Sequence, residues 1–107
     1  MGIRVSETKQ PREVVLKGID FNGSKRLATG DSVVESGSSV IITDEDGEDV
    51  TTDMLVLNSL EVSTGDNTAS AYIKGGETGK EYKISFLVAT ALGELLEEDI
   101  VLPVENL

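Results

Sequence analysis

The stretch EYKISFLVATALGELLEEDIVLPV, residues 81–104, decides the fold class. In its first half apolar and polar side chains alternate, and four of its residues fall on one face: Tyr82, Ile84, Phe86 and Val88. A period of two residues is typical of a half-buried β-strand. After the turn ALGE, four apolar residues of LLEEDIVLPV again share one parity: Leu96, Ile100, Leu102 and Val104. The stretch therefore predicts two β-strands separated by a tight turn.

Further short strands are expected along the rest of the chain. They fall in REVVLKGIDF (12–21), SVVES (32–36), SSVIIT (38–43), VTTDMLVLNSLEVS (50–63) and TASAYIK (68–74). The second and third of these are either two strands or one strand bent at Gly37. A short helix around Met54 is the alternative for residues 50–63, but the β-branched residues on both sides favour a strand. With turn signals about every 8–12 residues, the pattern predicts an all-β fold, an antiparallel two-sheet β-sandwich of immunoglobulin-like type with about seven strands.

The chain has 107 residues, which fits one domain. Residues 1–11 are polar, lack periodicity and end at Pro11, so they are expected to form a flexible N-terminal arm. Residues 12–107 are expected to form a single immunoglobulin-like β-sandwich domain. No segment resembles a secretory signal or approaches the roughly 18 apolar residues of a membrane span, so no membrane partner is expected.

The segment GGETGK, residues 75–80, resembles a nucleotide-binding loop only superficially. A P-loop has four residues between its first Gly and its Gly-Lys pair, and Ser or Thr follows. Here three residues separate Gly75 from Gly79, and Glu81 stands where the magnesium-binding hydroxyl would be. Both flanking segments are predicted strands, so the glycines are expected to shape the loop of a β-hairpin with Lys80 on the surface.

Charge is distributed unevenly along the chain. The net charge is −11, yet the first 26 residues carry six basic residues against three acidic ones. From Leu27 to Ile73 there is no basic residue, and there are ten acidic ones. An acidic surface repels phosphates, so no nucleic-acid partner is expected. Two interpretations remain: a charged surface that maintains solubility, or a basic end and an acidic body suited to head-to-tail protein contacts.

On the second interpretation, the protein-contact residues are charged residues of both signs. The basic candidates are Arg4, Lys9, Arg12, Lys25 and Arg26, and the acidic candidates are Asp44, Asp46 and Asp49.

The acidic candidates belong to the segment DEDGED, residues 44–49. An EF-hand loop alternates Asp with other residues before its Gly and places a Glu six residues after that Gly, whereas position 53 is Asp53. Asp-Gly between two apolar runs is instead a strong signal for a hairpin turn. A looser, weak calcium site built from neighbouring carboxylates is the alternative.

The sequence offers no constellation of residues for catalysis. It has no histidine and no cysteine, which removes the commonest general base and most zinc sites. Glu97, Glu98 and Asp99 are consecutive in a predicted strand, so their side chains alternate between faces and do not converge. The protein is therefore expected not to be an enzyme and to have no catalytic, cofactor or metal site.

Three segments together resemble a family of phage proteins: residues 19–36, 67–94 and 98–107. The matching positions are Asp20-Phe21, Leu27, Gly30-Asp31-Ser32-Val33, Ser36, Tyr72, Gly75-Gly76, Gly79, Tyr82, Thr90 and Gly93. The chain is similar in these to the small immunoglobulin-like structural proteins of tailed bacteriophages and prophages, of the fibre–tail adaptor or head–tail connector type. It departs from their pattern at Phe21 and Tyr72, where relatives often carry Trp, and in the acidic residues 44–53.

The resemblance implies a non-enzymatic structural component of a virion, an adaptor that links the portal or tail to fibres or to a neighbouring ring. The implied partners are portal, tail and fibre proteins, and further copies of the chain in a ring. The implied location is the virion, after synthesis in the cytoplasm of the bacterial host. The alternative is an immunoglobulin-like surface adhesion or ligand-binding module that binds a glycan or, weakly, calcium.

Overall fold

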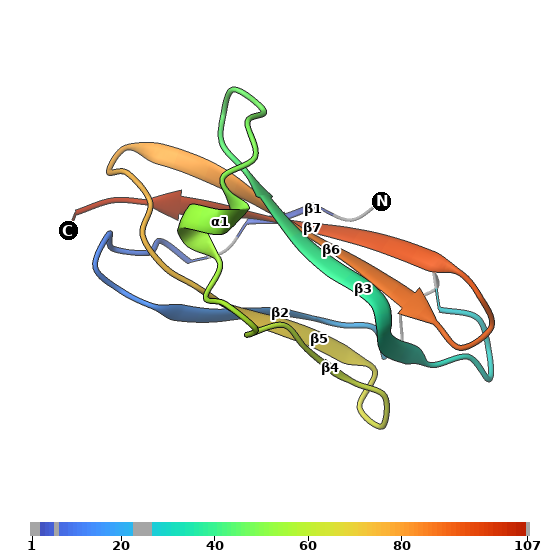
Figure 1. Ribbon diagram of the computed structural model, residues 1–107. Coiled ribbons are helices and arrows are strands. Elements are labelled where there is room, and N and C mark those ends of the chain that lie inside the picture. Colours follow the sequence, from blue (N-terminus) through green and yellow to red (C-terminus); the bar gives the residue numbers. More distant parts are fainter. Residues whose placement is uncertain (1–2, 6, 23–26, 107) are drawn as a thin grey trace.

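The computed structural model describes residues 3–5, 7–22 and 27–106, which form two stacked β-sheets (Figure 1). The elements in chain order are β1 (Ile3–Val5), β2 (Val15–Asp20), β3 (Val33–Thr43), α1 (Thr51–Met54), β4 (Glu61–Ser63), β5 (Thr68–Ile73), β6 (Lys80–Thr90) and β7 (Leu95–Val104). The larger sheet has the strand order β1-β7-β6-β3, and the smaller sheet has the order β2-β5-β4. The predicted all-β sandwich is confirmed.

The strand pairing is that of an immunoglobulin-like sandwich. In that fold strands A to G form the sheets A-B-E-D and C-F-G. Taking β2 to β7 as strands B to G reproduces these neighbours, since β2-β5-β4 and β3-β6-β7 are the observed orders. The first strand departs from this scheme because β1 pairs in parallel with β7, with Val5 opposite Val101. The immunoglobulin-like type is confirmed, and the antiparallel arrangement holds for every pair except this edge strand.

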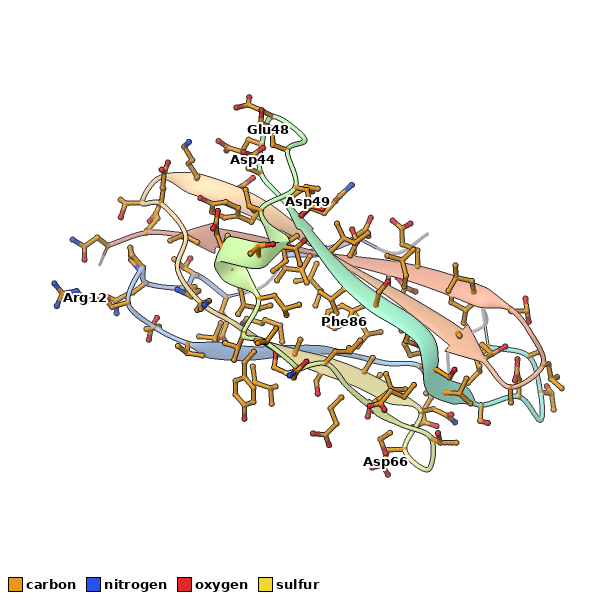
Figure 2. The ribbon with its side chains drawn as sticks, in the orientation of Figure 1. Arg12, Asp44, Glu48, Asp49, Asp66 and Phe86 are labelled. Atoms are coloured by element: carbon orange, nitrogen blue, oxygen red, sulfur yellow. The ribbon has the colours of Figure 1, made fainter. Side chains whose placement is uncertain are left out.

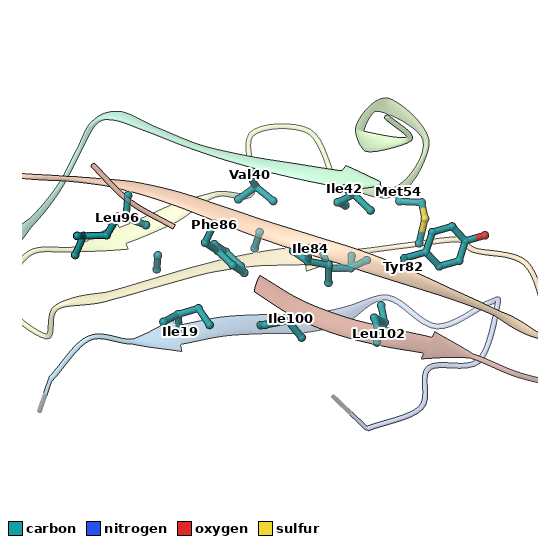
Figure 3. Packing of buried hydrophobic residues seen from close by; sticks show 14 of the residues in the cluster. Ile19, Val40, Ile42, Met54, Tyr82, Ile84, Phe86, Leu96, Ile100 and Leu102 are labelled. Atoms are coloured by element: carbon teal, nitrogen blue, oxygen red, sulfur yellow. The ribbon is translucent and has the colours of Figure 1, made fainter. Parts of the chain in front are cut away.

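The core lies between the two sheets and is built from their inward faces (Figure 3). All eight apolar residues that alternation assigns to one side of residues 81–104 are buried: Tyr82, Ile84, Phe86, Val88, Leu96, Ile100, Leu102 and Val104. The smaller sheet contributes Ile19, Ala71 and Ile73. The register of β6 with β7 runs from Lys80 opposite Val104 to Ala89 opposite Leu95, so the predicted pair of strands is confirmed.

Residues 33–43 form one strand with an irregularity in its middle, which decides between the two alternatives for this segment. The register with β6 shifts between Val34 and Ser39, and Gly37 has φ 86°, a left-handed conformation that favours glycine. At this register shift the Ser38 hydroxyl replaces backbone partners in hydrogen bonding. It donates to the Val34 carbonyl at 2.7 Å and accepts from the Ala89 amide at 2.9 Å.

The strand expected over residues 50–63 is wrong, because only Glu61–Ser63 is a strand and Thr51–Met54 is a short helix. Contacts with the free edge of β3 cause this. The Ile42 amide donates to Thr51 Oγ1 at 2.8 Å, and the Val50 amide donates to the Ile42 carbonyl at 2.8 Å. The chain then turns inward and buries Met54, whose side chain is 3% exposed. Tertiary packing thus overrides the β-branched composition of this segment.

The hairpin expected at GGETGK is also wrong. The strands before and after it, β5 and β6, belong to different sheets, so residues 74–79 cross from one layer of the sandwich to the other. The positive φ angles expected of its glycines are confirmed at Gly75, Gly76 and Gly79. The crossing explains why the loop needs them, since it must turn sharply over the end of the core.

Hydrogen bonds at Asp31 connect the loop before β3 to the turn between β6 and β7. Its Oδ1 accepts from the Ser32 amide at 2.8 Å and from the Leu92 amide at 3.0 Å, and the Ala91 amide donates to the Ser32 carbonyl at 2.9 Å. Desolvation raises the pKa of the Asp31 carboxyl, but hydrogen bonds from Thr90 and from these amides outweigh it, so the pKa lies below its ordinary value.

Because the folded-state pKa of Asp31 is lowered, its carboxylate stabilises the fold above the unfolded-state value of 3.8, and this contribution is lost as pH falls through the folded value. Asp31→Asn does not titrate there. We expect the free-energy difference between wild type and Asp31→Asn, measured by urea unfolding, to be larger at pH 7 than below pH 3.8, and to shrink further as the pH falls. A difference that does not change with pH would contradict this role.

Candidate protein-contact surfaces

The structure does not gather the predicted basic residues into one described patch. Lys25 and Arg26 lie outside the described residues, and Arg4 is described only as a backbone position in β1. Arg12 is exposed and lines a shallow recess with residues of the C-terminal end and the Gly-rich loop, among them Asn106 and Thr78. Figure 2 places Arg12 at one end of the sandwich, apart from the labelled acidic residues.

Lys9 is not on the surface, since its side chain is 1% exposed. Its ammonium donates to the Gly75 carbonyl at 2.7 Å, the Gln10 carbonyl at 2.7 Å and the Pro11 carbonyl at 3.3 Å. Burial lowers the pKa of this ammonium, and the charge of Glu13 opposes the shift. Lys9 therefore ties the N-terminal segment to the Gly-rich loop instead of meeting a partner.

The backbone of Lys9 is anchored as well. Its amide donates to the Pro103 carbonyl at 2.9 Å, and its carbonyl accepts from the Glu105 amide at 2.9 Å. These hydrogen bonds hold Lys9, near the end of the segment predicted to be an arm, against the C-terminal part of the chain. Earlier in the same segment, Ile3–Val5 pairs with β7. The flexibility of residues 1–11 stays a prediction.

Lys9→Ala is expected to lower the free energy of unfolding by about 1.5–3 kcal/mol, because it leaves buried carbonyls without their charged donor. Urea unfolding at pH 7 measures this change. Lys83→Ala, at an exposed position on β6, serves as the control and should change stability by less than about 0.5 kcal/mol. Equal effects of the two substitutions would contradict an anchoring role.

The acidic loop, residues 44–49, projects from the end of β3 on the side away from the β2-β5-β4 sheet (Figure 2). Asp44 Oδ1 accepts from the amides of Asp46 and Glu48, both at 2.9 Å, and Asp49 Oδ1 accepts from the Thr51 amide at 2.9 Å. Hydrogen bonds from Thr51 lower the pKa of the Asp49 carboxyl. Asp44 and Asp49 therefore shape the loop, while Asp46 and Glu48 are exposed near its tip.

The expected turn at Asp-Gly is confirmed. The Gly47 amide donates to the Asp44 carbonyl at 3.1 Å, and Thr43 bridges antiparallel to Asp49. Over residues 3–5, 7–22 and 27–106, no three acidic, histidine or cysteine side chains are grouped so that they could hold a metal ion. In the same described ranges, no helix has the length and apolar character needed to cross a membrane.

A recess separates the acidic loop from the Gly-rich loop. Its lining residues are Asp44, Val50, Asp53, Met54, Gly76, Glu77, Lys80 and Tyr82. The Lys80 ammonium lies 2.8 Å from Glu77 Oε2, which raises the pKa of Lys80, and the Glu77 amide donates to the Tyr82 hydroxyl at 2.9 Å. The Lys80 side chain is half-exposed, in agreement with the surface position predicted from the sequence. Its ammonium forms an ion pair with Glu77.

Sequence reasoning missed the exposed apolar residues. Leu16 on β2, Tyr72 on β5 and Val14 just before β2 are each about half exposed, and Leu57 is 84% exposed beyond α1. The signal was present in VVLKGID, residues 14–20, where Val14 and Leu16 share the parity opposite to the core residue Ile19.

Comparison with known proteins gives the family of this sandwich. A search of curated proteins finds no match to the chain. A family model described as "Podophage GP4 fiber-tail adaptor protein gp77" matches residues 9–103, which is most of the chain and covers β2 to β6 and all of β7 except Val104. The chain therefore belongs to the podophage GP4 fibre–tail adaptor protein gp77 family.

Proposed function

We propose that this protein is a non-enzymatic structural component of a tailed phage or prophage virion, where it links the portal or tail to fibres or to a neighbouring ring. The observation that carries the proposal is the family match over residues 9–103. The proposed location is the virion, reached after synthesis in the bacterial host cytoplasm. The proposed partners are portal, tail and fibre proteins and further copies of the chain in a ring.

The fold supports a role that depends on contacts. An immunoglobulin-like sandwich presents loops at its two ends and strands at its sheet edges, and repeated subunits with such surfaces build rings. The net charge of −11 argues for protein partners, because nucleic-acid phosphates would be repelled.

Charged residues are the proposed contacts with these neighbours. They are Arg4, Arg12, Lys25 and Arg26 on the basic side and Asp44, Asp46 and Asp49 on the acidic side. Lys9 is left out of this set because its ammonium is buried and bonded within the chain.

Deleting the gene from the phage or prophage tests the proposed function. We expect particles that lack this protein by mass spectrometry and that also lack fibres by electron microscopy, and both should return on complementation. Particles that keep a full set of fibres without the protein would overturn the adaptor role. Wild-type particles in which mass spectrometry finds no copy of the protein would overturn the location in the virion.

A further inference from the structure

Strand β7 carries a buried carboxylate that lacks a hydrogen-bond partner. Asp99 directly precedes the core residue Ile100, so alternation puts its side chain on the outer face of the larger sheet, where it is nevertheless only 1% exposed. Its Oδ1 atom has no hydrogen-bond partner in the part of the chain that the structure describes. Leaving a buried carboxylate oxygen unpaired costs free energy, so a donor that reached Asp99 would be bound favourably.

The described residues beside Asp99 do not supply this donor. Asp99 lies opposite Ser85 in the β6–β7 register and opposite Ile3 in the β1–β7 register, and isoleucine has no side-chain donor. On the same outer face Lys83 is exposed and Glu97 is half-buried, and Oδ1 of Asp99 stays unpaired beside them. Because the group to be satisfied is a carboxylate with another acid next to it, a positively charged donor suits it best.

Strand β1, which lies along the edge of β7, is a poor match for it (Figure 1). It has three residues and pairs in parallel, which is slightly less stable per residue than antiparallel pairing, and Val5 at its end is 73% exposed. The cation of this strand is one position away from the carboxylate, since Arg4 lies opposite Ile100 and not opposite Asp99. The backbone is held separately at Lys9, so β1 can leave β7 while that anchor stays.

The register also indicates what kind of segment would replace β1. A strand edge without its partner presents backbone donors and acceptors, which an extended segment of another chain can pair. Exchange of β1 between two copies of this chain would place Ile3 opposite Asp99 again, and the carboxylate would stay unpaired. A segment from a different protein with Lys or Arg at that position would pair it, so the observations favour a foreign strand over a second copy.

We propose that the edge of β7 binds an extended segment of another virion protein, which displaces β1 and places a Lys or Arg side chain against Asp99. Until assembly, β1 covers this edge and protects it from unspecific strand pairing. The inference names a contact surface for the proposed adaptor and the chemistry of its partner, and it rests on the proposed function.

The mismatch between β1 and β7 is testable in the purified full chain. Ile3→Lys supplies a cation opposite Asp99, and we expect hydrogen exchange at the amides of residues 3–5 to slow by roughly fivefold, the effect of a good cross-strand pair. Ile3→Met, a side chain of similar length without charge, is the matched control and should leave exchange unchanged. In an Asp99→Ser background Ile3→Lys should have no effect. No slowing in Ile3→Lys, or slowing that persists without Asp99, would overturn the proposal.

A disulfide tests whether β1 has to leave β7. The chain has no cysteine, and Val5 lies opposite Val101, so Val5→Cys/Val101→Cys can link the two strands. Particles from the gene deletion are mixed with purified protein and collected by sedimentation. We expect wild type and the reduced variant to bind, and the oxidised variant to bind roughly tenfold less or weaker still, because its edge stays covered. Circular dichroism shows whether both forms are folded.

The same assay separates this inference from the adaptor role. Equal binding of the oxidised and reduced forms would overturn the docking proposal and leave the adaptor role standing, whereas wild type that does not bind the deficient particles would overturn both.

Single-cysteine variants identify the occupant of the edge. Val5→Cys and Val101→Cys proteins are bound to the particles as an equimolar mixture and then oxidised, and we expect no disulfide between the two. A disulfide between residue 5 of one copy and residue 101 of another, found by mass spectrometry, would show that a second copy occupies the edge and that the proposed occupant is wrong.

Discussion

Phe86→Ala is expected to lower the free energy of unfolding by about 3–5 kcal/mol, the largest effect of any single truncation considered. The Phe86 ring is fully buried, and it lies between the two sheets (Figure 3). Removing it deletes apolar contacts with both layers and leaves a cavity that the stiff β-branched residues around it cannot fill. A domain of this size has a total stability of roughly 5–15 kcal/mol, so the variant loses a large part of it.

Urea unfolding followed by circular dichroism measures this change. Phe86→Leu keeps most of the side-chain volume and should cost less than the alanine variant, while Leu95→Ala, at a position 59% exposed, should change stability by less than about 0.5 kcal/mol. The fraction of folded protein available for virion assembly should fall with stability. A Phe86→Ala domain as stable as the Leu95→Ala domain would contradict the assignment of the core.

Gly76→Ala is expected to destabilise the domain by about 2–5 kcal/mol, through two effects that add. The residue has φ 95°, where a side chain is strained. A Cβ atom there would lie 2.8 Å from Val104 Cγ2 and 3.2 Å from Met54 Cε. Val104 is fully buried and β-branched, so it has little freedom to move away.

Gly79→Ala is the matched control for Gly76→Ala in the same loop. Gly79 has φ 85°, but a Cβ atom there would meet nothing within 4 Å. Backbone strain alone should then cost about 1–2 kcal/mol. Urea unfolding of the two variants separates strain from crowding, and equal losses at both positions would show that the contact with Val104 is unimportant. In both cases the glycines of GGETGK allow the chain to cross between the two sheets.

The strands with a clear alternation were predictable, and the connections between them were not. Alternation in residues 81–104 reports which side chains face the core, because this pattern depends only on neighbours in sequence. Whether GGETGK closes a hairpin or crosses between sheets depends on which strands pair, and that is decided by contacts among β3, β6 and β7. The same holds for α1, which forms because Thr51 bonds to Ile42 on the edge of β3.

The candidate contact surfaces, too, were predictable from the sequence only in part. Their charges and the glycine-containing acidic turn could be predicted from composition and spacing. The position of Lys9 could not, since its ammonium bonds to the Gly75 carbonyl, 66 positions away in the chain. The proximity of the exposed residues Leu16 and Tyr72 could not be predicted either, because they become neighbours only through the β2–β5 register.

The sequence by itself determined a β-sandwich with an aliphatic core, an acidic surface and a resemblance to phage adaptors, because local periodicity, charge and motif spacing need no knowledge of the fold. The tertiary structure alone decided which strands share a sheet, where Lys9 is buried and which apolar side chains stay exposed. The physical reason is that burial and pairing are properties of segments brought together from distant parts of the chain, and only the folded arrangement specifies those partners.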